Sequence, residues 1–325
     1  MAVNPAEQLV GRKVSVEVPA TSANLGPGYD CVGVSLSMWD HVSVTTRERP
    51  GVVIRVAGEG HDTVPHDESH LVVATLRQGL VDLGHPRPDI GLELSAHNRT
   101  PHSRGLGSSA AAIASGLCLA WGLARPGEAL DRDRLLTMAT AIEGHPDNAA
   151  PAILGGAQVA WVQDGKVRHI GLEVHPGIRF RAYVPDRHVP TALARHVLPA
   201  TIPRADAVHQ VLASTLLVTA LSTAPQYLLA ATQDWIHQSY RRPLMPESGD
   251  LIDRLRAAGV PAVISGAGPT VLALGTAQML QAADRVDADG FVVSDLELAG
   301  GVRLLAGPGT GPSGDSGQDS PRGPA

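Results

Sequence analysis

The segment Pro101-His-Ser-Arg-Gly105-Leu-Gly107-Ser108-Ser109-Ala110-Ala-Ala joins a polar loop to an alanine-rich run that continues to about residue 124. Its two glycines let the backbone approach a ligand closely, and the run predicts a helix over about 108–124. A helix N-terminus presents unpaired N–H groups and a partial positive charge, which suits a phosphate. A serine hydroxyl at this end can also bind Mg²⁺. The alternative interpretation is a Gly-Ser helix start that only caps itself.

Two better-known phosphate motifs do not fit this segment. A Walker A loop requires Gly-Lys-Ser/Thr, and the segment contains no lysine. Gly105-x-Gly107-x-x-Ala110 formally matches the dinucleotide fingerprint, but that motif leaves a strand directly and is followed after about 20 residues by an acid that ends a second strand. Here the next acids, Glu128 and Asp131, follow the predicted helix. We therefore interpret the dinucleotide match as accidental.

On both sides of this segment the hydrophobic pattern alternates between strand and helix periods. Alternating residues predict strands at 14–18 (ending at Pro19), 40–47, 51–57, 90–96, 156–162, 166–172 and 178–184, followed by a strand–turn–strand unit over 261–275 and a last strand near 294. Helical stretches are predicted at 69–84, 108–124, from 131 onward, and at 205–222, 225–238 and 248–258. Mixed strands and helices in this order predict layered α+β structure, not regular βαβ units.

Length and composition limit the class of protein. The chain has 325 residues, of which 43% are hydrophobic, so at roughly 100–200 residues per domain it is long enough for two domains. Its net charge of −6 and the lack of a basic stripe argue against nucleic-acid binding. Cys31 and Cys118 are too few for a disulfide framework or a zinc cluster, which favours a reducing compartment.

Neither the first residues nor the longest weakly polar stretch predicts a targeting signal or a membrane span. Residues 1–12 are polar and lack the apolar core of a signal peptide. The longest weakly polar stretch, 108–124, is shorter than a typical membrane span of about 20 residues. The tail over 306–325 is rich in Gly, Pro, Ser and Asp, which predicts disorder. We therefore expect a cytoplasmic protein without a membrane partner.

Together with three other segments, the Pro101–Ala110 segment resembles the GHMP kinases, a family of small-molecule kinases. Their central motif, Pro-x-x-x-Gly-Leu-Gly-Ser-Ser-Ala, matches at every fixed position. Residues 19–33, Pro-Ala-Thr-Ser-Ala-Asn-Leu-Gly-Pro-Gly-Tyr-Asp-Cys-Val-Gly, resemble the homoserine kinase branch, with Tyr29 in place of the usual Phe. Residues 143–156 resemble the same branch, and Ser265-Gly-Ala-Gly-Pro-Thr270 matches the carboxy-terminal glycine-rich motif.

The resemblance implies a fold and a reaction. We expect a two-domain α+β protein with an N-terminal domain over 1–160, which holds a left-handed βαβ unit, and a ferredoxin-like α/β sandwich over 161–305. The implied reaction is transfer of the γ-phosphoryl group of ATP to the side-chain hydroxyl of L-homoserine, in threonine biosynthesis. A homodimer is expected by analogy alone.

The resemblance also assigns the nucleotide and metal site. Mg²⁺ would be held by Ser108 and Glu143, whose hard oxygen atoms suit that ion. His70 would lie near the adenine, where relatives often carry asparagine. The phosphates would be bound along the segment Pro101, His102, Ser103, Arg104, Gly105, Leu106, Gly107, Ser108, Ser109, Ala110 and Ala111.

The amino-acid site is assigned in the same way. The implied substrate-binding residues are Asn24, Asp30, His145, Arg195 and Arg241. The implied catalytic residues are Asp30, Asp147 and Asn148, with Asp30 and Asn148 near the reacting hydroxyl. Two guanidinium groups suit a substrate carboxylate, because each can bind it through two hydrogen bonds. Asp147 is either the general base or a group that orients His145 or the loop backbone.

Blander interpretations exist for these residues. A lone Asn or Asp in a glycine-rich loop, such as Asn24 or Asp30, is commonly a turn former, and either arginine could be a surface charge. His66-x-x-x-His70 has metal-like spacing but no third ligand, so zinc is disfavoured. The competing functions are a GHMP kinase for another alcohol, a nucleotide sensor of the same fold and a dehydrogenase.

Overall fold

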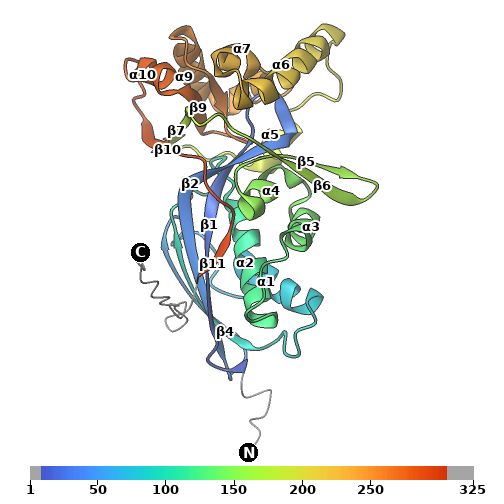
Figure 1. Cartoon of the computed structure of the whole chain (residues 1–325). Coiled ribbons are helices and arrows are strands. Elements are labelled where there is room, and N and C mark those ends of the chain that lie inside the picture. The colour runs from blue at the N-terminus through green and yellow to red at the C-terminus, as the bar shows by residue number, and fades with distance from the viewer. Residues whose placement is uncertain (1–8, 306–325) are drawn as a thin grey trace, which may run out of the picture.

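The computed structural model describes residues 9–305, and its first sheet is built around two long antiparallel strands, β1 (Lys13–Asn24) and β2 (Gly28–Arg47). The other strands of this sheet are β3 (Val52–Gly58), β4 (Gly91–Asn98), β5 (Ala157–Gln163), β6 (Lys166–Leu172) and β11 (Arg303–Leu305). The order is β11-β1-β2-β4-β3 (Figure 1). Strand β2 is long enough to pair with two further strands: its residues 32–34 pair with β5, and its residues 41–47 pair with β4. Strand β6 completes a hairpin with β5.

A parallel βαβ unit lies at one edge of this sheet. Strands β3 and β4 pair in parallel, and helix α1 (Leu71–Asp82) makes the crossover that parallel neighbours require. Figure 1 shows α1 on one side of the sheet together with α2 (Ser108–Ala124), α3 (Arg132–Glu143) and α4 (Pro146–Leu154). The bounds of α2 are those predicted from the sequence. Its small residues allow close packing, since a Cβ on Gly116 would lie 1.9 Å from Thr75 Oγ1 of α1.

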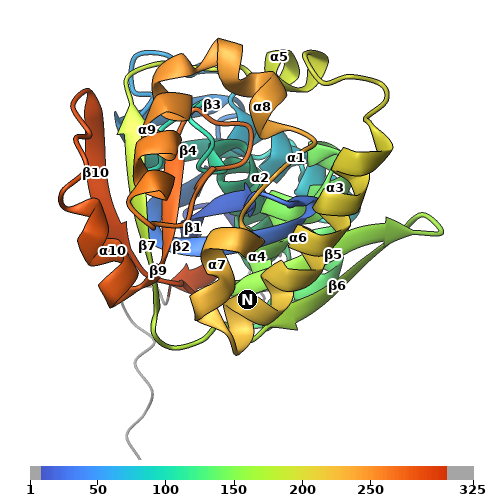
Figure 2. The same cartoon turned by 90° about the horizontal axis from the view of Figure 1, so that it is seen from above.

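The second sheet is fully antiparallel and has the strand order of a ferredoxin-like fold. Its strands are β7 (Ile178–Pro185), β8 (Ala262–Ile264), β9 (Val271–Thr276) and β10 (Phe291–Leu296), in the order β10-β7-β9-β8. The helices of this part are α5 (Thr191–His196), α6 (Arg204–Ser222), α7 (Leu228–Ala231), α8 (Gln238–Arg241), α9 (Pro246–Ala257) and α10 (Ala277–Ala283), with 3-10 turns η2 (Pro225–Tyr227) and η3 (Arg242–Leu244). They gather above the strands in Figure 1 and are seen from above in Figure 2.

One hydrophobic cluster joins the two sheets. Leu25 of the β1–β2 turn and Val34 and Leu36 of β2 pack in the same buried cluster as Phe180 and Leu272 of the second sheet. Because dense cores tolerate little displacement, this shared cluster fixes the first sheet's β1–β2 turn against the second sheet. Residues from both parts can therefore form one site.

Several elements differ from those predicted. Strand β1 does not end at Pro19: it continues to Asn24, with a register irregularity between Pro19 and Ala20 that accommodates the missing N–H. The predicted helix over 225–238 is broken into η2 and α7 and then a loop leads to α8. Strand β11 lies far along the chain from β1 yet pairs with it. The expected disordered tail, 306–325, lies outside the described residues.

The predicted domain boundary after residue 160 stays a prediction. The β5–β6 hairpin crosses this position, and β11 returns to the first sheet after the second is complete. Within residues 9–305, α6 is long and apolar enough, by length and composition, to cross a membrane. This helix is longer than 108–124, and 28% of its apolar window is buried. Leu217 and Leu221 are buried in the hydrophobic core, whereas Val208, Val211 and Leu212 are exposed.

Candidate active site

The loop before α2 packs against the carboxy-terminal glycine-rich motif, residues 265–270. Gly107 is the N-cap of α2 in the left-handed region, at φ 70°, and Gly105 has φ 81°. A Cβ on Gly105 would lie 2.2 Å from the carbonyl oxygen of Ser265, so only glycine fits this contact. Ser265 Oγ donates to the Gly105 carbonyl at 2.6 Å and lies 2.8 Å from Ser22 Oγ. Three of the four motif segments therefore meet at the start of α2.

Two cavities share Ser103, Ser108 and Ser109 as lining residues. The larger has a volume of about 270 Å³ and is otherwise lined by Asp40, Val42, Val64, Pro65, Ser69, His70, Leu71, Val72, Asn98, His102, Ala112 and Ser115. The smaller, of about 130 Å³, is otherwise lined by Asn24, Asp30, Gly105, Gly107, Glu143, His145, Asp147, Asn148, Thr191, Arg195, Arg241, Gly266 and Ala267. We call these the large cavity and the charged cavity. Nearly all the charged groups of the pair lie in the second.

The large cavity contains a buried imidazole without protein partners. His70 is 5% exposed, and neither of its ring nitrogens has a hydrogen-bond partner within residues 9–305. Burial lowers the pKa of His70, so the ring is neutral and can donate one hydrogen bond and accept one. Ser115 Oγ in the same lining is also unpartnered. Buried polar groups are normally satisfied, so these atoms fit a ligand with its own donors and acceptors.

Asn24 and Asp30 form a turn and also line the charged cavity. Both have left-handed backbones, at φ 73° and 53°, which costs energy in non-glycine residues. The Asp30 N–H donates to Asn24 Oδ1 at 2.9 Å, and Asn24 Nδ2 donates to the Gly266 carbonyl at 2.9 Å. The turn-forming interpretation of these residues is therefore supported, and it places both side chains at the cavity.

The two arginines of the charged cavity have different partners. Arg195 forms a two-pronged ion pair with Asp30, at 3.0 and 3.1 Å. Arg241 is 2% exposed and bonds to neutral groups, including the Ala194 carbonyl at 2.9 Å. Within residues 9–305 no carboxylate lies within ion-pair distance of Arg241, and burial lowers its pKa. Arg242, by contrast, bonds Asp250 at 2.7 Å and Asp253 at 2.6 Å near the surface.

The start of α4 brings three further polar side chains together. Asp147, 2% exposed, contacts His145 Nδ1 and accepts the Asn148 N–H at 2.9 Å. The hydrogen bond that the His145 ring donates to the Asp147 carboxylate raises the pKa of His145. Thr21 Oγ1 donates to Asn148 Oδ1 at 2.8 Å, which leaves the amide nitrogen of Asn148 available. Thr21 was not among the residues singled out, although it lies within the quoted 19–33 segment.

The start of α2 has oxygen groups that fit Mg²⁺. Glu143 Oε2 accepts a hydrogen bond from Ser109 Oγ at 2.8 Å, so it is Ser109, and not Ser108, that this carboxylate contacts. In the described part of the chain no three His, Cys, Asp or Glu side chains gather as a metal cluster. Mg²⁺ commonly uses only one or two protein carboxylates together with substrate phosphates and water. One carboxylate and two hydroxyls beside a helix N-terminus satisfy that requirement.

Some residues predicted to bind ATP have side chains elsewhere. Arg104 turns to the Pro185 carbonyl at 3.0 Å and to Asp186. Four other residues of this segment have buried side chains that line neither cavity: Pro101, Leu106, Ala110 and Ala111. Their assignment as ATP-binding residues stays a prediction, and it applies only to their backbone groups.

Comparison with known proteins identifies the family. Residues 70–156 match the GHMP kinases N terminal domain, and residues 218–290 match the GHMP kinases C terminal domain. The chain is 71% identical to a homoserine kinase of Cutibacterium acnes over 292 residues, which cover 90% of this chain and 99% of that protein. It is 49% identical to a homoserine kinase of Streptomyces coelicolor over 277 residues, covering 85% of this chain and 87% of that one.

Solved structures show the same relationship. The crystal structure of homoserine kinase from Cytophaga hutchinsonii superposes with a TM-score of 0.76 at 27% identity, covering 90% of this chain and 97% of that chain. Mevalonate kinase of L. major shares the fold, with a TM-score of 0.66 at 14% identity, over 87% of this chain and 95% of that one. The chain belongs to the GHMP kinases, an enzyme family with a two-domain α+β fold. Within that family it is a homoserine kinase.

Proposed function

We propose that the two cavities bind the two substrates of the homoserine kinase reaction, ATP in the large cavity and L-homoserine in the charged cavity. The observation that carries this assignment is that both cavities meet at Ser103, Ser108 and Ser109, at the positive end of α2. The γ-phosphoryl group of ATP would lie at this junction. The reaction yields O-phospho-L-homoserine for threonine biosynthesis.

The charge distribution supports an amino-acid substrate. Among residues 9–305 Arg241 has no carboxylate partner, and a buried unpaired charge is costly. A substrate carboxylate would supply the missing negative charge, with Arg195 as a second donor group. Asn24, Asp30 and His145 line the remaining wall as polar contacts for the ammonium group and side chain. A sterol or an apolar alcohol would leave these groups unsatisfied.

Phosphoryl transfer needs positioning and charge stabilisation more than covalent chemistry. The backbone N–H groups at Gly105 to Ser109 would hold the phosphates, as anions are held at helix N-termini. Glu143, with Ser108 or Ser109, would hold Mg²⁺, which neutralises phosphate charge when bound. Thr21 donates to Asn148 Oδ1, and Nδ2, which donates to no group among residues 9–305, would orient the substrate hydroxyl.

Asp147 is the candidate general base of the charged cavity. Asp30 is ion-paired with Arg195, whereas Asp147 has no arginine partner in the described part of the chain and lines the same cavity. We propose that Asp147 accepts the hydroxyl proton, while its contact with His145 fixes its position. The alternative role is only to orient His145 and the start of α4.

The test is ADP release with Mg-ATP and L-homoserine, with mevalonate, shikimate, L-serine and L-threonine as parallel acceptors. We expect turnover with homoserine alone and its loss with EDTA. Turnover on another alcohol would retain the phosphate site but remove the carboxylate assignment. ATP binding without turnover on any acceptor would favour a nucleotide sensor.

We further propose that the enzyme works in the cytoplasm as a homodimer, without a nucleic-acid or membrane partner. The net charge of −6 supports the absence of nucleic-acid binding. Light scattering coupled to size exclusion tests the dimer: a mass near that of one 33.8 kDa chain would contradict it.

A further inference from the structure

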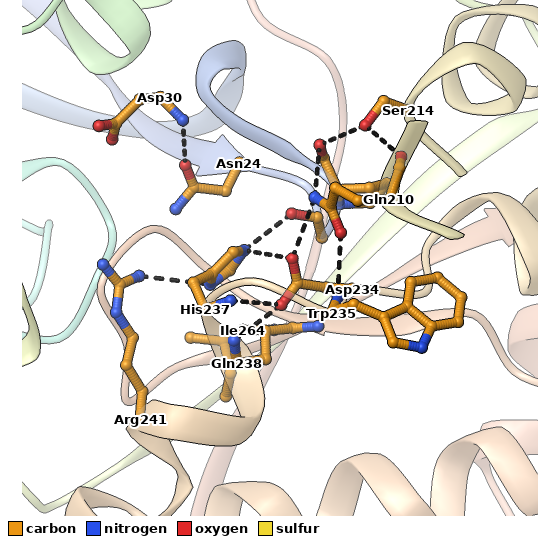
Figure 3. A network of polar contacts seen from close by, with 12 residues as sticks. Asn24, Asp30, Gln210, Ser214, Asp234, Trp235, His237, Gln238, Arg241 and Ile264 are labelled. Carbon is orange, nitrogen blue, oxygen red and sulfur yellow. Dashed lines mark hydrogen bonds and ion pairs between the residues drawn. The ribbon is translucent and has the colours of Figure 1, made fainter. Parts of the chain in front are cut away.

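Behind Arg241 lies a buried network that no step of the phosphoryl transfer uses. His237 and Asp234 both have fully buried side chains, and His237 Nε2 lies 3.4 Å from Asp234 Oδ1. Figure 3 shows that His237 stands between this aspartate and Arg241. Charged side chains are rarely buried to this degree unless they are paired. The network therefore needs an explanation.

The partners of His237 define the protonation state of its ring. Nε2 lies 2.8 Å from the Gly26 carbonyl oxygen, which can only accept, so Nε2 carries the hydrogen. Nδ1 lies 3.4 Å from Arg241 Nη1, which can only donate, so Nδ1 is the acceptor. A doubly protonated ring would direct an N–H at a guanidinium. Burial and the charge of Arg241 both lower the pKa of His237, although Asp234, the hydrogen bond to Gly26 and Asp30 oppose this shift.

The bonds of Arg241 determine which of its nitrogens is available. Nε donates to the Ala194 carbonyl, and Nη1 donates to both the Gly266 carbonyl and His237 Nδ1. Three of the five guanidinium hydrogens are thus used. Among the described residues Nη2 has no hydrogen-bond partner, so its two hydrogens are free for a ligand in the charged cavity that Arg241 lines.

His237 is itself held on several sides. Asp234 Oδ2 accepts the backbone N–H groups of His237 and Gln238, at 3.0 and 2.8 Å, which fixes the start of α8. Gln210 of α6 donates to Asp234 Oδ1 and to the Pro27 carbonyl. The Tyr29 ring stacks on His237 with 5.1 Å between centroids, and the Arg241 guanidinium carbon lies 5.7 Å from the same tyrosine ring.

We propose that His237 is a positioning residue for the substrate carboxylate: as a neutral acceptor it holds Nη1 of Arg241, so that Nη2 receives the carboxylate. It also connects Arg241 to Gly26, in the turn that carries Asn24 and Asp30. One imidazole therefore contacts both Arg241 and the turn beside Asn24 and Asp30, and these three residues line the same charged cavity. This inference rests on the proposed location of homoserine.

A pair of substitutions separates the two hydrogen bonds of His237. In His237→Asn, Oδ1 can take the place of Nδ1 and still accept from Arg241. In His237→Gln, Nε2 can still donate to the Gly26 carbonyl, but no acceptor remains at the position of Nδ1, beside Arg241. We expect His237→Gln to raise KM for homoserine about tenfold or more, because the lost bond involves a charged group. We expect His237→Asn to raise KM clearly less, and kcat and KM for ATP to change less than threefold in either variant.

Three controls make the experiment specific. His209→Gln, an exposed histidine of α6, should leave the kinetics unchanged. The His237→Gln effect should be absent with 3-amino-1-propanol, which is homoserine without its carboxylate. In an Arg241→Met background His237→Gln should have no further effect on KM for homoserine, since the two changes remove the same interaction. Equal losses for both acceptors, or additive losses in the double variant, would overturn the proposal.

Nitrogen NMR of the substrate-free protein provides a readout independent of activity. We expect the His237 ring to be the Nε2-protonated neutral tautomer at pH 7, and to stay so below the ordinary histidine pKa of about 6.5. An Nδ1-protonated or charged ring would overturn the proposal even if homoserine were turned over. Failure of the wild-type enzyme to phosphorylate homoserine, with this tautomer observed, would instead contradict the proposed function alone.

Discussion

Both carboxylate oxygens of Asp30 accept hydrogen bonds from the terminal nitrogens of Arg195, at 3.0 and 3.1 Å, although 165 positions separate the two residues. The pair connects the start of β2 with α5, and both residues line the charged cavity. Substrate binding must therefore share or replace this ion pair. Arg195 retains Nε–H and one hydrogen on each terminal nitrogen for the substrate carboxylate.

Arg195→Ala should weaken homoserine binding strongly. The change removes a donor group for the carboxylate and leaves Asp30 unpaired beside it, which together cost about 2–5 kcal/mol, or at least about 30-fold in KM. Steady-state kinetics with varied homoserine measure this, with the exposed Arg168→Ala as a matched control. An unchanged KM would remove Arg195 from the substrate site.

Asp147→Asn tests the general base. If Asp147 takes the hydroxyl proton, kcat should fall by about 10²-fold or more with little change in KM. Asp133→Asn, at an exposed position of α3, serves as the control. A kcat within about tenfold of wild type would instead assign Asp147 to holding His145 and Asn148.

Glu143→Gln should raise the Mg²⁺ concentration needed for half-maximal activity by about tenfold or more, since a neutral amide replaces an anionic ligand. A magnesium titration at saturating ATP measures the effect, and exposed Glu48→Gln is the control. Comparing Ser108→Ala with Ser109→Ala decides which hydroxyl assists. Because Glu143 contacts Ser109, we expect the titration of Ser109→Ala to shift as well. Identical titrations for Glu143→Gln and wild type would remove Glu143 from the metal site.

His70→Leu should separate ATP binding from stability. Both ring nitrogens of His70 are buried and have no hydrogen-bond partner among the described residues, so leucine removes two desolvated polar atoms and should leave Tm unchanged or higher. The same change should raise KM for ATP about tenfold and leave KM for homoserine unaltered. Exposed His66→Gln is the control. A lower Tm with a normal KM for ATP would mean that His70 has a structural role instead.

The stability contribution of His145 should depend on pH in a definite direction. Asp147 raises the pKa of His145, so the folded protein binds this proton more tightly than the unfolded chain. The resulting stabilisation is complete below the unfolded pKa of about 6.5 and is lost as the pH rises through the higher folded value. Denaturant unfolding of wild type and His145→Gln should therefore differ most at pH 5.5 and less at pH 8.5. A difference that stays constant over this range would contradict the pKa shift.

The local features of the site follow from the sequence. Periodicity and small residues predict α2 with the observed bounds, and the glycines at 105 and 107 predict a backbone that only glycine adopts easily. Segments at 19–33, 101–110, 143–156 and 265–270 identify the family. These features depend on steric preferences within a few residues, so a single sequence carries them.

The side-chain partners were decided by the tertiary structure. Sequence spacing could not show that Glu143 contacts Ser109, that Thr21 holds Asn148, or that His237 lies between Asp234 and Arg241. Nor could it show that β11 returns to pair with β1. Each of these relationships joins groups through the packing of several elements around the shared core, and short-range periodicity contains no information on which distant faces meet. The sequence thus determined the family and its reactive residue types, whereas the packed core determined which atoms of those residues remain free to bind.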